Sequence, residues 1–206
     1  SRGIKNSIIS TTGRQTLNII SLNLNHRTHK KRLPEGLFPA LATHSPDVIV
    51  FNELVIGDGR PELHHAFRSL GLSFVAVSPA VPYSPGRWQN QVAIASRWPI
   101  QVMAVPAGPD ASANTNVLSV QTAGTSLIGV RAPGYKRMAD WYAWWEWFIA
   151  LADAQVLIGD FNVDPARARK KDRAFQPLMT SKGYARATPT GTWSYQGANG
   201  TMAFLD

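Results

Sequence analysis

The sequence contains no cysteine among its 206 residues. This absence excludes disulfide bonds, thiolate-bound zinc, iron–sulfur clusters and a cysteine nucleophile. Long hydrophobic runs are missing as well, because no stretch approaches the roughly 18 apolar residues that a membrane span needs. All five histidines lie between positions 26 and 65. We therefore expect no stable membrane insertion, no thiol chemistry and no imidazole base from the rest of the sequence.

Acidic residues are absent from residues 1–34, which hold seven basic residues. A second basic cluster lies at residues 167–173, and the formal net charge of the chain is +8. Taken alone, each cluster also fits a solvated surface or a loose arm. Two clusters in a strongly basic chain favour a phosphate-binding face. The basic balance therefore favours a polyanionic partner, such as an anionic membrane surface or a nucleic acid, and DNA is the partner we favour.

Short apolar and β-branched runs alternate with helical patterns along the sequence. They predict helices at residues 34–44, 61–70, 136–152 and 171–182. They predict strands at residues 17–24, 48–51, 74–77, 91–96, 102–105, 117–121, 127–130, 156–158, 192–195 and 202–205. Most strands have hairpin spacing, so we expect an α+β (α/β) sandwich of two packed, mostly antiparallel sheets flanked by helices. Residues 1–16 are expected to be a loose basic segment, and residues 17–206 one domain.

The predicted helix at residues 136–152 is rich in tryptophan. Trp141, Trp144, Trp145 and Phe148 recur at helical spacing and form one apolar stripe, with Trp147 beside it. Core packing is the expected role of this stripe. The alternative is a helix that contacts a membrane, but its basic flank is small and it also carries acidic residues.

Three predicted strands end in oxygen-bearing side chains. Asn23 and Asn25 end the first, Glu53 follows the second, and Asp160 and Asn162 follow the strand at residues 156–158. Residues two apart in an extended segment point to the same side, so these ends could converge on one polar pocket. Each signal taken alone also fits a surface turn or a cap. Together they form a set without thiols or nearby histidines, which suits Mg²⁺ or Mn²⁺ rather than zinc.

The order of these motifs resembles the endonuclease/exonuclease/phosphatase superfamily, which includes exonuclease III, DNase I-like nucleases, retrotransposon endonucleases and phosphatases. The motifs that carry the resemblance lie at residues 21–25, 46–53, 92–100, 132–133, 158–162, 192–193 and 204–206. The resemblance implies a DNase I-like sandwich and metal-dependent hydrolysis of a phosphodiester. The expected function is a DNA endonuclease, similar to an AP endonuclease or to a retrotransposon-type endonuclease domain. The alternatives are a phosphatase or phospholipid phosphodiesterase of the same superfamily, or a non-catalytic nucleic-acid-binding relative.

The resemblance also implies roles for single residues. It implies Glu53 as the principal metal ligand and Asn25 as a neighbour of the metal. It implies Asp160 as the group that orients or deprotonates the attacking water. Asn23 is implied as a phosphate-binding or neighbour-orienting amide, and Asn162 as an amide that stabilises phosphoryl oxygens or holds its neighbours.

Two features depart from the family pattern. Arg131 stands where the family often has histidine or tyrosine, and it either binds phosphate or forms a salt bridge. Arg97 and Arg87 are further candidates for contact with the substrate phosphate. Asp206 resembles a carboxylate that orients a catalytic histidine, but the Ser-Asp-His-type motif that supplies this histidine is not in the sequence. We therefore expect the domain to be incomplete at its C-terminal end, without its last strand, and reduced in cleavage.

Overall fold

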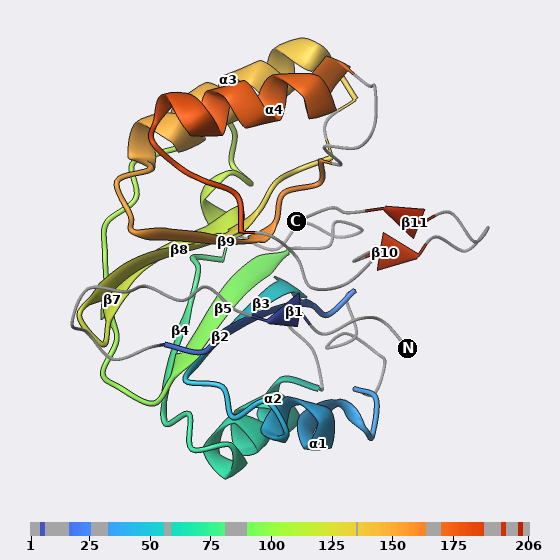
Figure 1. Cartoon of the computed structure of the whole chain (residues 1–206), viewed down its shortest axis with the longest axis vertical. Coiled ribbons are helices and arrows are strands. Elements are labelled where there is room, and N and C mark those ends of the chain that lie inside the picture. Colours follow the sequence, from blue (N-terminus) through green and yellow to red (C-terminus); the bar gives the residue numbers. More distant parts are fainter. Residues whose placement is uncertain are drawn as a thin grey trace.

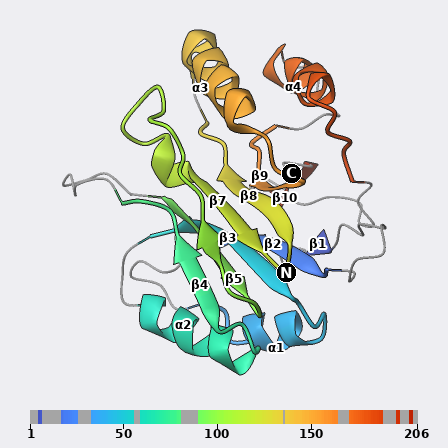
Figure 2. The same cartoon turned by 90° about the vertical axis from the view of Figure 1, so that its left-hand side faces the viewer.

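Two β-sheets pack face to face, and each carries a pair of helices on its outer face (Figure 1). Helices α1 (Leu37–Ala42) and α2 (Gly59–Ser69) cover one sheet, and α3 (Met138–Leu151) and α4 (Lys170–Ser181) cover the other (Figure 2). This arrangement confirms the predicted α+β sandwich. The computed structural model describes residues 5–6, 17–25, 33–55, 59–80, 90–134, 136–163, 170–187, 195–196 and 202–203.

The first sheet has the strand order β1-β2-β3-β5-β4. In that order its strands span Lys5–Asn6, Ile19–Asn23, Val48–Leu54, Gln91–Ser96 and Phe74–Val77. β2 and β3 are parallel, and the other neighbours are antiparallel. Within the segment 1–16 that is predicted to be loose, Lys5 and Asn6 pair with β2 opposite Ser21 and Ile20. The reason is that an edge strand offers a row of free backbone donors and acceptors, which a neighbouring segment can fill.

The second sheet has the strand order β6-β7-β8-β9. Its strands span Gln101–Val102, Val117–Thr122, Thr125–Arg131 and Val156–Asp160. β8 and β9 are parallel, and the other pairs are antiparallel. A short 3₁₀ turn, η1 (Asn114–Asn116), leads into β7. A separate antiparallel pair, β10 (Tyr195–Gln196) with β11 (Met202–Ala203), lies where the late strands are predicted.

The two parallel pairs decide where the strand ends meet. β2 with β3, and β8 with β9, run in the same direction within their sheets, so each pair ends at one edge of its sheet. The sheets contact each other through β2 with β9 and through β3 with β8. The carboxyl ends of all four strands therefore come together at one end of the sandwich. Loops that follow such strands are common places for functional residues.

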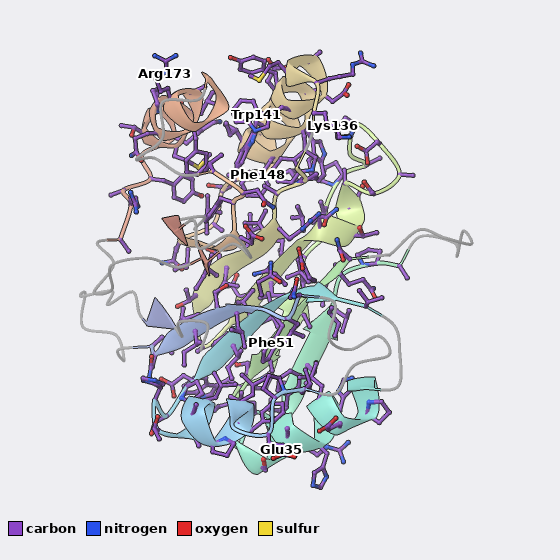
Figure 3. The ribbon with its side chains drawn as sticks, turned by 90° about the vertical axis from the view of Figure 1, so that its right-hand side faces the viewer. Glu35, Phe51, Lys136, Trp141, Phe148 and Arg173 are labelled. Atoms are coloured by element: carbon purple, nitrogen blue, oxygen red, sulfur yellow. The ribbon has the colours of Figure 1, made fainter. Side chains whose placement is uncertain are left out.

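Three apolar clusters hold these layers together. Alternate residues of each strand face opposite sides, so Val50 faces the space between the sheets and Phe51 faces α1 and α2. Trp141 and Phe148 fill the space between α3 and the second sheet, and Figure 3 shows the positions of Phe51, Trp141 and Phe148. The buried tryptophan stripe confirms the expected core role, and Trp147 packs against the same cluster. No helix within the described ranges is long and apolar enough to span a membrane.

Gly129 in β8 lies where the two sheets approach each other. A Cβ atom at this position would lie 2.8 Å from Val92 Cγ1 and 3.0 Å from Val50 Cγ1. We expect Gly129→Ala to lower the free energy of unfolding by about 1–3 kcal/mol, because added atoms overpack a well-filled core. Urea denaturation measures the change. Gly134→Ala is the control, since its Cβ would meet nothing within 4 Å. Equal stability of the two variants would contradict this reading of the interface.

Candidate functional site

Buried polar residues gather at one end of the sandwich. Among the described residues, most buried polar and charged residues lie at the end where β2, β3, β8 and β9 finish. The exceptions are Ser96 and Thr122, which are buried at the other end with their hydroxyls 2.8 Å apart. Buried polar groups cost free energy unless they are paired or have a ligand, so the end where these four strands finish is the candidate site. The residues are Asn52, Glu53, Ser78, Gln91, Thr115, Asn116 and Asp160.

Asp160 is held by hydrogen bonds to both carboxylate oxygens. It is the last residue of β9, and its side chain is almost entirely buried, with the residue 6% exposed. Asn23 Nδ2 donates to Asp160 Oδ2 at 2.8 Å, and the Asn162 backbone N–H donates to Asp160 Oδ1 at 3.0 Å. The Asn25 backbone N–H in turn donates to Asn23 Oδ1 at 2.7 Å, which fixes the amide. The carboxylate is therefore fixed in one orientation before any ligand arrives.

Asn162 closes the turn that follows β9. Its Nδ2 donates to the carbonyl oxygen of Ala132 at 2.5 Å, and the Ala132 N–H donates to the Asp160 carbonyl oxygen at 2.7 Å. The amide therefore ties the chain after β9 to the chain after β8. The hydrogen bonds of Asn162 hold neighbouring residues in place, and holding its neighbours is one of the two roles that the resemblance implies for it.

Glu53 sits in a β-bulge near the end of β3. Phe51 pairs with Ala93 and Leu54 pairs with Gln91, so three steps along β3 match two along β5. The extra residue turns the side chain of Glu53 away from the regular alternation, which is a common use of bulges near functional sites. Its φ angle is +56°. A left-handed backbone costs a residue with a Cβ roughly 1–2 kcal/mol, so the sheet holds Glu53 in a strained conformation.

Arg131 contacts Glu53 across the space between the sheets. It ends β8 in register with Asp160, and its Nη2 donates to Glu53 Oε1 at 3.3 Å. The Arg131 side chain is 20% exposed and the Glu53 side chain 11% exposed. Of the two roles predicted for Arg131, the structure contains the salt bridge. The Arg131 Nε is buried and has no hydrogen-bond acceptor in the part of the chain that is described.

The donor atoms around Glu53 fit a magnesium-like ion. No group of three or more histidine, cysteine, aspartate or glutamate side chains in the described ranges is arranged as a ready-made metal site. Mg²⁺ needs no such cage, because it keeps several water ligands and takes one or two carboxylates. The carboxylate of Glu53 supplies one. The neighbouring Asn52 side chain is fully buried, and its Oδ1 has no hydrogen-bond donor in the described part. Carboxylate, amide and water oxygens together suit Mg²⁺ or Mn²⁺.

Some predicted site residues do not join this cluster. Arg97 follows β5, whose last residue pairs with Val48 at the start of β3, so it lies at the other end of the sandwich. There its Nε donates to the Pro46 carbonyl oxygen at 3.1 Å and lies 3.3 Å from Asp47 Oδ1. Arg97 therefore lies apart from Arg131 and Glu53, and its contact with a substrate phosphate stays a prediction. Arg87 and Asp206 lie outside the described residues.

No individual role was predicted for two asparagines at the site. Asn52 donates through Nδ2 to Ser21 Oγ at 3.3 Å, and it stands directly before Glu53 in the same motif. Asn116 precedes Val117, which pairs with Val130, so the strand register puts Asn116 beside Arg131. The Oδ1 atoms of both asparagines are buried without a hydrogen-bond donor among the described groups. Asn52 could have been found from its place next to Glu53, whereas Asn116 has the sequence context of an ordinary turn.

Comparison with solved structures finds the same fold in an AP endonuclease and in the enzyme NExo. An AP endonuclease from Archaeoglobus fulgidus superposes with a TM-score of 0.55 and 21% identity, covering 81% of this chain and 71% of that one. The 3′-5′ exonuclease NExo from Neisseria meningitidis gives a TM-score of 0.55 and 23% identity, over 79% and 70% of the two chains. NExo from Neisseria, described as a 3′ phosphatase bound to a product DNA hairpin, gives 0.53 and 20%, over 79% and 70%.

Comparison of sequences gives the family directly. No curated protein matches the chain at a significant level. The model of the endonuclease/exonuclease/phosphatase family matches residues 20–206, which is most of the chain. The match includes Glu53, Arg131 and Asp160 of the candidate site. The chain therefore belongs to the endonuclease/exonuclease/phosphatase family.

Proposed function

We propose that the protein is a divalent-metal-dependent phosphodiesterase that cleaves DNA as an endonuclease. The observation that carries this proposal is the pair of buried carboxylates, Glu53 and Asp160, at the end of the sandwich. A β-bulge changes the direction of the Glu53 side chain, and hydrogen bonds to both oxygens fix the carboxylate of Asp160. A structural role needs neither arrangement. Hydrolysis of a phosphodiester needs both a charge-neutralising centre and a positioned base.

Glu53 would hold the metal ion, and Asn25, which follows the strand that runs parallel to β3, would add an amide oxygen directly or through water. When bound, such an ion neutralises the charge that develops on the phosphoryl group and lowers the pKa of a bound water. Asn52 would contribute through its buried Oδ1. The strained backbone of Glu53 keeps its carboxylate pointed at this place without a further conformational change.

Asp160 would orient the attacking water and accept its proton. Asn23 holds Oδ2 and the Asn162 backbone N–H holds Oδ1, so the carboxylate cannot rotate away from the reacting water. Asn23 and Asn162 are thus positioning residues for Asp160. Arg131 lies beside the pair and would bind a phosphoryl oxygen.

Three observations support DNA as the substrate. The formal net charge is +8, which favours a polyanionic partner. Arg173, on the outer side of α4, is exposed and belongs to the basic cluster at residues 167–173 (Figure 3). The same fold occurs in an AP endonuclease and in NExo, which has been solved bound to a product DNA hairpin. DNA is therefore favoured over inositol phosphates and phospholipids as the substrate.

Nicking of supercoiled plasmid tests the proposal. The protein is expressed from its complete reading frame and assayed in Mg²⁺, in Mn²⁺ and in EDTA. We expect nicking in either metal and none in EDTA, with a loss of at least about hundredfold in Glu53→Gln, which removes charge stabilisation of the transition state. Glu62→Gln, on the exposed side of α2, is the matched control and should nick at the wild-type rate.

Other outcomes point to other functions. Turnover of inositol phosphates or of phospholipid vesicles without plasmid nicking would indicate the phosphatase or phospholipid phosphodiesterase alternative. DNA binding that Glu53→Gln leaves intact, with no cleavage in any metal, would indicate a binding module that keeps the fold and has lost the chemistry.

A further inference from the structure

Arg131 and Glu53 form a partly buried ion pair at the place where a cation would bind. The distance from Nη2 to Oε1 is 3.3 Å, and the two side chains are 20% and 11% exposed. Charges interact more strongly at such a place than at a fully solvated surface, because less water screens them. The carboxylate that is proposed to ligate the metal is therefore already paired with a positive charge of the protein.

The charges of the cluster depend on what is bound. Glu53, Asp160 and Arg131 carry two negative charges and one positive charge, which leaves one net negative charge among them. A divalent cation changes this sum to one positive charge, which matches the single negative charge of a phosphodiester. Without the phosphodiester, Arg131 and a cation would repel each other across a short distance. Cation and phosphodiester should therefore bind better together than either binds alone.

Arg131 has hydrogen-bonding capacity that the described part of the protein does not use. A guanidinium has five N–H donors in a planar fork that matches the oxygens of a phosphate. One Nη2 contact goes to Glu53, while Nε is buried and has no acceptor within the described ranges. A buried donor without an acceptor is costly, so an incoming phosphate oxygen would satisfy it. The geometry allows Arg131 to exchange a carboxylate partner for a phosphate partner.

We propose that Arg131 couples cation binding to substrate binding. In the free protein Arg131 holds Glu53 in an ion pair and weakens its affinity for a divalent cation. When a phosphodiester arrives, Arg131 turns to the phosphate and no longer competes with a cation for Glu53. The active centre then loads its cation mainly when the substrate is present. This inference rests on the proposed function, because it assumes that Glu53 ligates the cation.

Binding of Mn²⁺, followed by the electron paramagnetic resonance signal of free Mn²⁺, tests this coupling without any turnover. We expect Arg131→Gln to bind Mn²⁺ at least about fivefold more tightly than the wild type, the lower end of common coupling energies. Arg131→Lys keeps the positive charge and should stay close to the wild-type affinity. Arg97→Gln, which removes an arginine at the far end of the sandwich, is the control and should have no effect.

Two thymidine dinucleotides measure the link to substrate. One has a phosphorothioate linkage, which is charged and resists cleavage, and the other has a neutral methylphosphonate linkage. The charged dinucleotide should raise the Mn²⁺ affinity of both proteins. The increase should be at least about fivefold larger in the wild type than in Arg131→Gln. The neutral dinucleotide should give no such difference. Thermal unfolding confirms that each variant is folded.

The outcomes separate this inference from the proposed function. Unchanged or weaker Mn²⁺ binding in folded Arg131→Gln would overturn the coupling, even if Glu53→Gln abolishes binding and the nuclease proposal stands. If Mn²⁺ binds equally well to the wild type and to Glu53→Gln, the metal site itself is wrong, and both proposals fall.

Discussion

Replacing Asp160 with asparagine is expected to lower the rate of DNA nicking by at least about hundredfold, the lower end of the contribution of a general base. Asparagine keeps the shape of the side chain but cannot accept a proton from water. It also places an NH₂ group where one carboxylate oxygen now accepts a hydrogen bond, from Asn23 Nδ2 or from the Asn162 N–H. The loss should appear in kcat with little change in KM, because the interaction is made in the transition state.

The stability of Asp160→Asn shows whether the effect is chemical. Mismatch of one buried hydrogen bond is expected to cost about 1–3 kcal/mol, which leaves the protein folded if its stability is ordinary. Asp140→Asn is the matched control, because Asp140 lies in the first turn of α3 with its side chain 43% exposed. It should nick at the wild-type rate. Wild-type nicking by folded Asp160→Asn would mean that Asp160 only anchors the loops, and the proposed mechanism would need another base.

The meeting of Asn23 and Asp160 could be predicted from the sequence. Both follow apolar runs that end in polar residues, and the alternation of a strand puts such residues on one side. Strands β4 and β5 were also predicted with the bounds that the structure has. These features depend on local patterns, namely periodicity and the residues that end a strand. The resemblance supplied the missing global information, that strand ends far apart in the chain share one edge.

The position of Arg97 outside the cluster has a definite physical cause. Arg97 follows an apolar strand just as Glu53 and Asp160 do, so the local pattern is the same. β5, however, runs antiparallel to β3, and the residue after β5 therefore lies at the opposite end from the residue after β3. Strand direction is decided by long-range pairing, which no short motif records. A strand end predicts a site only when the direction of the strand is known.

The partner of Arg131 could not be predicted for a related reason. Its contact with Glu53 depends on where the Glu53 side chain points, and that direction is set by the bulge between Phe51 and Leu54. The bulge exists only as a mismatch between two strands that are far apart in sequence. Asn116 was missed because its position beside Arg131 follows from the pairing of β7 with β8, not from its own neighbours.

Gly159→Ala is expected to lower the free energy of unfolding by at least about 4 kcal/mol, which is exceptional for one substitution. Gly159 has a φ angle of +148°, which an alanine rarely adopts. An added Cβ atom would lie 1.9 Å from the carbonyl oxygen of Val130, the residue that pairs with it in β8. The clash is with backbone rather than with a flexible side chain, so it can be relieved only by separating β8 from β9.

Gly124→Ala is the matched control for this variant. Gly124 also has a positive φ angle, +71°, but a Cβ there would meet nothing within 4 Å. Its substitution should cost only about 1–2 kcal/mol, the price of the left-handed backbone alone. The difference between the two variants in urea denaturation therefore isolates the clash with Val130. Similar losses in both would show that β8 and β9 are less closely paired than described.

The position of Gly159 also links stability to the candidate site. It stands directly before Asp160, and the pairing of β8 with β9 sets Arg131 beside Asp160. If low temperature keeps Gly159→Ala folded, β9 must have shifted away from β8 to make room for the methyl group. The Asp160 carboxylate would then move relative to Asn23 on the other sheet, and hydrogen-bond distances tolerate only a few tenths of an ångström. Such a folded variant should therefore still lose most of its nicking activity, which kinetic assay below the unfolding temperature can test.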